Sequence, residues 1–154
     1  MDQQLLDRLA IRDLVEKLPV MVTPRWLNTR SQPIGIRDVL QYLVGVQLRE
    51  ETFNRSFDIG GPEVLTYKQM LLQFAEVRGL RRFIYAVPVM TPRLSSYWLY
   101  FVTSTSYKLA VNLVNSMKVE VVAANNDLER LLGITPMTYR RAVEIAFERV
   151  RQDT

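Results

Sequence analysis

Three aromatic side chains share one face of a predicted helix and could line a ligand pocket. Tyr97, Tyr100 and Phe101 recur at i, i+3 and i+4, the spacing that brings side chains together on a helix. Pockets for small molecules are often lined by such rings, whose polar ends can orient a ligand. A helix buried in a hydrophobic core gives the same pattern and is the commoner cause of it. The spacing therefore leaves a pocket wall and a core helix as alternatives.

Most catalytic side-chain chemistry is excluded because the sequence contains no cysteine and no histidine. Their absence removes thiolate nucleophiles, histidine general bases, the serine–histidine–aspartate triad and nearly all transition-metal sites. The acidic pairs Glu50–Glu51 and Asp127–Glu129 lack apolar neighbours that would raise a pKa, so we interpret them as solvated charges. No G-x-G-x-x-G turn, P-loop, Tyr-x-x-x-Lys or G-x-S-x-G motif occurs. We therefore expect no catalytic residue, no metal site and no bound cofactor in this chain.

The charge distribution indicates an ordinary globular surface. Twenty basic and sixteen acidic residues give a net charge of +4, and the basic excess is scattered through the second half. Nucleic-acid-binding proteins usually carry a denser basic stripe or a recognisable module, so nucleic acid is not expected as a partner. Residues 1–10 lack the apolar core of a signal peptide, and the charge-poor stretch Leu94–Tyr107 is too short to span a membrane. We expect a cytoplasmic chain with no membrane contact, which the absence of cysteine fits.

Hydrophobic periodicity predicts helices and short strands that alternate over the first half of the chain, which indicates a helix-rich α/β fold. The clearest helix begins at a capping box formed by Thr66 and Gln69 and ends at Gly79. Gly60-Gly61-Pro62 precedes this helix and is interpreted as a turn. A phosphate site is the less common alternative, because two adjacent glycines specify one only weakly. Strands are expected at Val20–Thr23, Ile34–Ile36, Phe53–Ile59 and Arg82–Val87, with a β-branched run at Val119–Val122. Further helices are expected at residues 2–18, Val39–Gln47, Pro92–Val102, Tyr107–Met117 and 127–132, and from Thr138 onward.

Five blocks of sequence resemble the C-terminal part of atypical extended short-chain dehydrogenase/reductases. These proteins bind NAD(P) and are related to nucleoside-diphosphate-sugar epimerases and to a complex I accessory subunit. The resemblance extends over about residues 11–150, whereas residues 1–10 do not match and are expected to be added sequence or a replaced terminus. The matching blocks are Arg12–Leu27, Ser31–Val39, Phe57–Met70, Ala86–Trp98 and Leu131–Pro136.

The resemblance implies that residues 1–154 form a single domain of a longer Rossmann-fold protein. This domain would supply a partial Rossmann-type sheet of a few short strands and a helical substrate-binding lobe. The glycine-rich turn and the catalytic tyrosine would lie upstream, so this chain would not be catalytic alone. NAD or NADP is implied for the full-length parent, an oxidoreductase or epimerase-like enzyme that acts on a small-molecule substrate.

The resemblance also places the segment containing Trp26, Arg30 and Gln32 near the substrate cleft. Tyr97 and Tyr100 of the aromatic helix are the other candidate substrate contacts. A packing role for Trp26 and a surface role for Arg30 are the commoner alternatives. In epimerase-like relatives an arginine of this segment grips the phosphate of a nucleotide sugar. Here Ser31 takes its place, and Arg30 stands one residue earlier.

Two other functions remain open: a non-catalytic scaffold or sensor of the same family, and a basic interaction module. For any of them, the isolated chain is expected to bind neither NAD nor NADP, because it has no glycine-rich turn. It is also expected to self-associate, because the predicted strands and the stripe of Met70, Leu71 and Phe74 would lack the upstream sheet.

Overall fold

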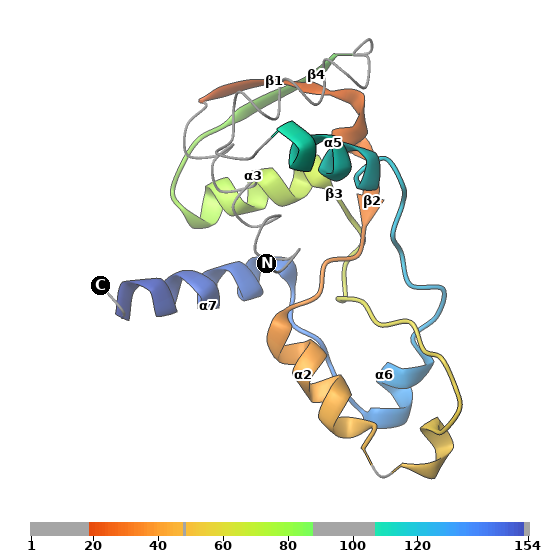
Figure 1. Cartoon of the computed structure of the whole chain (residues 1–154). Coiled ribbons are helices and arrows are strands. Elements are labelled where there is room, and N and C mark those ends of the chain that lie inside the picture. Colours follow the sequence, from red (N-terminus) through yellow and green to blue (C-terminus); the bar gives the residue numbers. More distant parts are fainter. Residues whose placement is uncertain (1–18, 48, 88–106, 153–154) are drawn as a thin grey trace. The chain divides into compact units, whose positions relative to one another are not determined.

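The computed structural model describes residues 19–47, 49–87 and 107–152, which form two compact units (Figure 1). The first unit comprises residues up to Thr29 together with Thr66–Glu120, and the second comprises Arg30–Leu65 and Val121–Thr154. Elements of the first unit are strand β1 (Val20–Pro24), 3-10 helix η1 (Arg25–Asn28), helix α3 (Tyr67–Val77), strand β4 (Phe83–Val87) and helix α5 (Tyr107–Ser116). Elements of the second are strand β2 (Arg30–Ser31), helix α2 (Ile36–Gly45), 3-10 helix η2 (Glu50–Thr52), helix α6 (Asp127–Leu132) and helix α7 (Tyr139–Gln152). Strand β3 (Leu65–Thr66) pairs with β2, and the boundary between the units falls between its two residues.

Strands β1 and β4 form a parallel pair, and α3 lies between them in the chain (Figure 1). A parallel pair needs a crossover connection, which α3 supplies here as in other α/β folds. The pairing of Met21 with Ile84 places two buried side chains on the inner face of the sheet. Val20, Phe83 and Tyr85 form the outer sheet face and are more than half exposed. The chain is thus a helix-rich α/β protein with a small parallel sheet, as the sequence predicts.

Helix α3 begins and ends where the sequence predicts. Thr66 Oγ1 accepts a hydrogen bond from the Gln69 amide at 3.2 Å, and Gln69 Oε1 accepts one from the Thr66 amide at 2.8 Å, which completes the capping box. At the other end Gly79 adopts a φ of +69°, and the Leu80 amide donates to the Ala75 carbonyl at 2.8 Å. This is a Schellman ending, and it needs a residue that tolerates positive φ.

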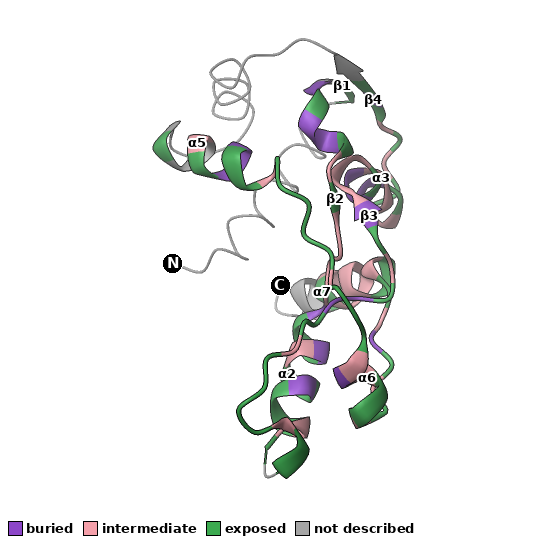
Figure 2. Ribbon diagram, turned by 90° about the vertical axis from the view of Figure 1, so that its right-hand side faces the viewer, coloured by how far each residue is buried: buried purple, intermediate pink, exposed green. Residues whose placement is uncertain are grey.

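The apolar stripe of α3 is buried inside the first unit (Figure 2). Met70, Leu71 and Phe74 are each less than a tenth exposed. The expectation that this stripe would remain uncovered without an upstream sheet is therefore wrong, because the unit closes over it.

In the second unit α2 and α6 lie side by side and turn their buried positions toward each other (Figure 2). Asp38 and Tyr42 are the buried side chains of α2, and Leu128 is that of α6. Gly45 allows the close approach, since a Cβ there would lie 2.8 Å from Leu132 Cδ1. Gly133 ends α6 with a φ of +65°, as predicted.

Two predicted strands are wrong. Residues Phe53–Ile59 alternate in polarity but form an irregular loop, in which Phe53 is 54% exposed and Asn54 has a φ of +55°. The segment pairs with no strand among the described residues, so alternation alone does not make it a strand. Ile34–Ile36 leads into α2 instead, and a short strand lies at Arg30–Ser31, where none was predicted. Of the run Val119–Val122, only Val121 makes a β-bridge, with Ser31.

The predicted strands at Val20–Thr23 and Arg82–Val87 are confirmed as β1 and β4, and the predicted helix at Tyr107–Met117 as α5. The predicted helices at residues 2–18 and Pro92–Val102 lie outside the described residues, as do residues 1–10. No helix within the described ranges combines the length and apolar character needed to cross a membrane.

Candidate functional site

Trp26 lies in η1, directly after β1, and is buried in the first unit. Its indole Nε1 and the amide Oε1 of Gln73 on α3 are both buried without a hydrogen-bond partner in the described part of the chain. The two elements that carry these atoms, η1 and α3, are in contact. A buried polar atom left unpaired costs about 1–3 kcal/mol, so each of these two atoms would gain stability from a hydrogen-bond partner.

Arg30 lies on β2 of the second unit, with an exposed side chain and a fixed backbone. Its carbonyl accepts a hydrogen bond from the Val121 amide at 3.2 Å, and the Gln32 amide donates to the Val121 carbonyl at 2.9 Å. These two bonds hold the segment around Ser31 in an extended conformation. The guanidinium is therefore presented from a strand rather than from an irregular loop.

The side chain of Gln32 ties three segments of the second unit together. Its Nε2 donates to the Gly61 carbonyl at 2.7 Å, and its Oε1 accepts from the Ala123 amide at 2.9 Å. Both ends of the amide are thus bonded to the backbone. A ligand could still use the remaining N–H of this amide.

Glycine is required at positions 60 and 61 because neighbouring residues lie too close to leave room for a side chain, and not because the backbone conformation is unusual. Neither has a positive φ, and the chain bends at Pro62 rather than turning on the two glycines. A Cβ on Gly60 would lie 2.5 Å from Gln32 Cδ, and one on Gly61 would collide with the Pro33 carbonyl oxygen. The pair therefore makes room for the Gln32–Pro33 segment.

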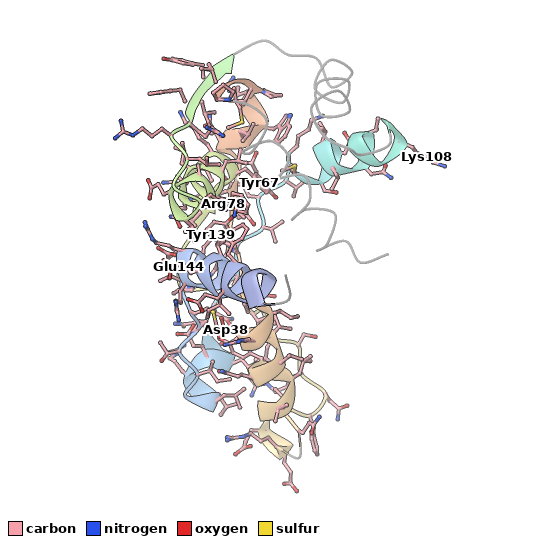
Figure 3. All side chains as sticks on the ribbon, turned by 90° about the vertical axis from the view of Figure 1, so that its left-hand side faces the viewer. Asp38, Tyr67, Arg78, Lys108, Tyr139 and Glu144 are labelled. Atoms are coloured by element: carbon pink, nitrogen blue, oxygen red, sulfur yellow. The ribbon has the colours of Figure 1, made fainter. Side chains whose placement is uncertain are left out.

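Asp38 is the most deeply buried charged side chain among the described residues, with 2% of its surface exposed. Asp38 lies at the start of α2 (Figure 3). Its Oδ2 accepts a hydrogen bond from the Met137 amide at 3.1 Å, which anchors this end of α2 to the segment before α7. One turn later, burial raises the pKa of Tyr42, and the carboxylates of Glu129 and Asp38 add to the shift. The carboxylate therefore positions backbone within the second unit.

The two acidic pairs carry no sign of catalysis. Glu50 and Glu51 are exposed in η2, and Asp127 forms a 2.5 Å ion pair with Arg130 on the surface of α6. These three residues fit the interpretation as solvated charges, whereas Glu129 is half-buried and helps to raise the pKa of Tyr42. No cluster of three metal-ligating side chains occurs in the described part of the chain.

The described residues proposed to contact substrate are divided between the two units. Arg30 and Gln32 are two positions apart in the second unit, whereas Trp26 belongs to the first unit. Tyr97 and Tyr100 lie outside the described residues.

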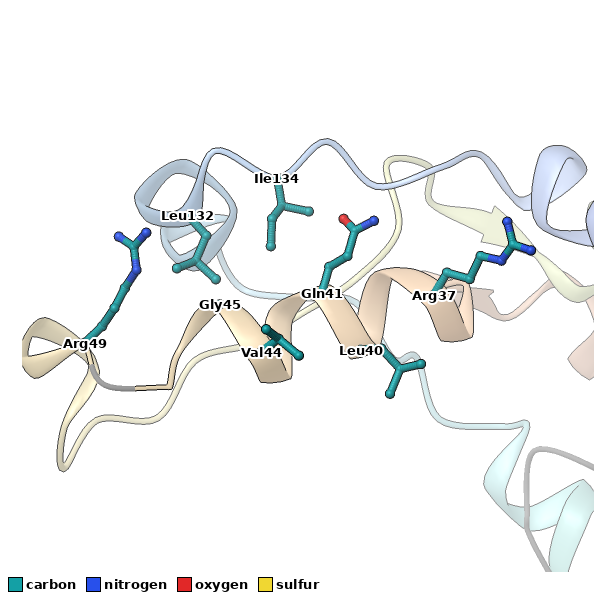
Figure 4. A pocket seen from close by; sticks show the side chains of 8 residues that line it. All are labelled: Arg37, Leu40, Gln41, Val44, Gly45, Arg49, Leu132 and Ile134. Carbon is teal, nitrogen blue, oxygen red and sulfur yellow. The ribbon is translucent and has the colours of Figure 1, made fainter.

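A groove that the sequence analysis missed lies between α2 and α6, with a volume of about 440 Å³ (Figure 4). Leu40 and Val44 line it from α2, and Leu132 and Ile134 from α6 and the residues after it. Arg37 and Arg49 lie at opposite ends of the row of lining side chains (Figure 4). The signal in the sequence is the spacing of Ile36, Leu40, Leu43 and Val44 on one helical stripe.

No family model matches the sequence, and no curated protein does. Among solved structures, the fold is similar to that of a nucleoside-diphosphate-sugar epimerase from Staphylococcus aureus, with a TM-score of 0.60. The two are 14% identical, and the match covers 92% of this chain and 47% of the epimerase. The chain thus spans about half the length of that protein. At this identity the likeness shows the fold alone: a partial Rossmann-like, epimerase-like α/β fold.

Proposed function

We propose that this chain is the substrate-binding C-terminal portion of an NAD(P)-dependent oxidoreductase or nucleoside-diphosphate-sugar epimerase-like protein, and that it is not catalytic alone. The observation that carries the proposal is the extent of the match, which takes in nearly all of this chain and about half of the epimerase. The resemblance to short-chain dehydrogenase/reductases supports the same assignment. The proposal also places the parent in the cytoplasm.

The cofactor belongs to the part of the parent that this chain does not contain. A dinucleotide pyrophosphate is bound by a glycine-rich turn at a helix N-terminus, and the sequence has no such turn. NAD or NADP would carry the hydride chemistry, and this chain would bind and orient the substrate.

Substrate contacts are assigned to Trp26, Arg30, Gln32, Tyr97 and Tyr100. Trp26 is assigned on the resemblance, which places the segment from Trp26 to Gln32 near the substrate cleft. The exposed guanidinium of Arg30 suits a phosphate, which it can bind with two parallel hydrogen bonds. Gln32 holds the backbone from which Arg30 projects.

Ligand-observed NMR titration with UDP-glucose tests these assignments. Trp26→Phe removes the indole N–H and keeps an aromatic ring, and Arg30→Ala removes the guanidinium. Each is expected to weaken binding by about tenfold, the effect of about 1.4 kcal/mol. Arg25→Ala is the matched control, because Arg25 is an exposed arginine beside Trp26 to which no contact is assigned. Equal weakening by all three variants, or no binding of UDP-glucose by the unaltered chain, would count against the proposal.

A further inference from the structure

Helix α2 exposes an apolar stripe to solvent. Ile36, Leu40, Leu43 and Val44 fall at i, i+4, i+7 and i+8, and their exposed fractions range from 45% to 66%. The core-facing side of the same helix carries Asp38 and Tyr42. Continuous apolar patches on a soluble surface commonly mark an interaction site.

Two stripe residues, Leu40 and Val44, also line the groove beside α6, and Leu132 and Ile134 form its other wall (Figure 4). The groove is open along the helix rather than closed over like a cofactor pocket. An extended apolar partner lying in it could cover the stripe at the same time. This is how an amphipathic helix docks into a hydrophobic groove.

The two arginines at the ends of the groove define the charge of such a partner. Neither the Arg37 nor the Arg49 guanidinium forms an ion pair within the described residues. No carboxylate lines the groove. Between the arginines the lining is mostly apolar, with one neutral polar side chain, Gln41. The surface therefore complements a segment that is mostly apolar in the middle and acidic at both ends.

A second copy of this chain fits the groove poorly. A two-fold pairing of α2 with itself in antiparallel orientation would bring Arg37 near Arg49 of the other copy. A parallel two-fold pairing would bring each arginine near its own equivalent. Either arrangement places like charges together, which disfavours it.

From these observations we infer that the α2–α6 groove binds an amphipathic helical segment of another protein, with an apolar stripe flanked by acidic residues at both ends. A single-headed anionic amphiphile would satisfy only one of the two arginines. A helical segment satisfies both and covers the stripe. This surface is separate from the residues assigned to substrate, so the inference does not depend on the proposed function.

Fluorescence anisotropy with two designed peptides tests the inference on the full chain. Both peptides are about 15 residues long and carry leucines at i, i+3, i+4 and i+7; one has glutamates at both ends and the other has lysines. The glutamate-ended peptide should bind the unaltered chain at least about tenfold more tightly than the lysine-ended one, and less tightly at high salt.

Charge reversal at the groove supplies the decisive comparison. The double variant Arg37→Glu/Arg49→Glu should lose the glutamate-ended peptide and gain the lysine-ended one, a gain that misfolding cannot produce. Arg25→Glu/Arg81→Glu is the matched control, since it changes the charge equally at two exposed arginines away from the groove. It should retain the preference of the unaltered chain.

Several results would overturn the inference. Equal affinity for both peptides, no binding of either, or an unchanged preference in the groove variant would each do so. Sodium decanoate, a single-headed amphiphile, is the alternative ligand. If it displaces the peptide and this displacement needs only one of the two arginines, the groove is assigned to a single-headed amphiphile instead.

Discussion

Replacing Asp38 by alanine tests whether a buried carboxylate holds the second unit together. The carboxylate is 2% exposed and accepts one hydrogen bond, from the Met137 amide at 3.1 Å. Alanine would leave that N–H without its acceptor, at a cost of about 1–3 kcal/mol. It would also remove a negative charge from the first turn of α2, where the helix dipole stabilises it by about 0.3–1 kcal/mol. We expect a total loss of about 1.3–4 kcal/mol in the free energy of unfolding.

The chain provides a matched control for this substitution. Asp58 Oδ2 also accepts a single backbone hydrogen bond, from the Ala124 amide at 3.0 Å, but this residue is exposed. Water can replace that acceptor, so Asp58→Ala should cost no more than about 0.5 kcal/mol. Asp38→Asn keeps an acceptor oxygen and loses only the charge, so it should fall between the two alanine variants.

Urea unfolding measures the free energy of unfolding of all three variants. An unchanged slope of this free energy against urea concentration indicates that only stability has changed. Hydrogen exchange at the Met137 amide provides a local measurement and should accelerate in Asp38→Ala. Equal losses for Asp38→Ala and Asp58→Ala, or an unaltered exchange rate at Met137, would refute the reasoning, because burial would then not decide the cost.

Three further predictions concern packing, pH and assembly. Gly61→Ala should destabilise the chain by about 1–3 kcal/mol in urea unfolding, because its Cβ would collide with the Pro33 carbonyl; a loss below about 0.5 kcal/mol would contradict the close approach. The raised pKa of Tyr42 favours the protonated phenol in the folded state, so the contribution of Tyr42 to the free energy of unfolding is complete below pH 10 and is lost as the pH rises above 10. Tyr42→Phe should reduce this loss of stability at alkaline pH. Identical profiles of stability against pH for the variant and the unaltered chain would be inconsistent with the raised pKa. The chain should self-associate through the outer sheet face, whose apolar side chains are exposed. Light scattering at micromolar concentration that detects only a 17.9 kDa species would disprove this prediction.

Local signals in the sequence were sufficient to predict some elements. The capping box of Thr66 and Gln69 and the glycine at position 79 define α3 because each acts within one turn of the helix. The β-branched run at Val20–Thr23 likewise became β1. The alternation at Phe53–Ile59 failed as a strand signal because a strand also needs a partner, which no local pattern specifies.

Contacts between distant residues could not be predicted. The Gln32 side chain forms hydrogen bonds with the backbone of Gly61 and Ala123, which are 29 and 91 residues away, so nothing near Gln32 in the sequence indicates that it joins these segments. The glycine pair was interpreted as a turn because its actual requirement, room for Gln32 and Pro33, arises only in the folded chain. Nor does periodicity identify the buried face of α2, because this helix buries Asp38 and exposes its apolar stripe, the reverse of the usual arrangement.

Calorimetric titration of the chain with UDP-glucose, NAD and NADP tests the central claim most directly. If the chain is the substrate-binding portion of an epimerase-like protein, UDP-glucose should give a saturable binding heat, and neither dinucleotide should bind measurably. Micromolar binding of NAD or NADP would contradict the assignment of the cofactor to the rest of the parent. Absence of any heat with UDP-glucose would contradict the assignment of a nucleotide-sugar substrate to this chain.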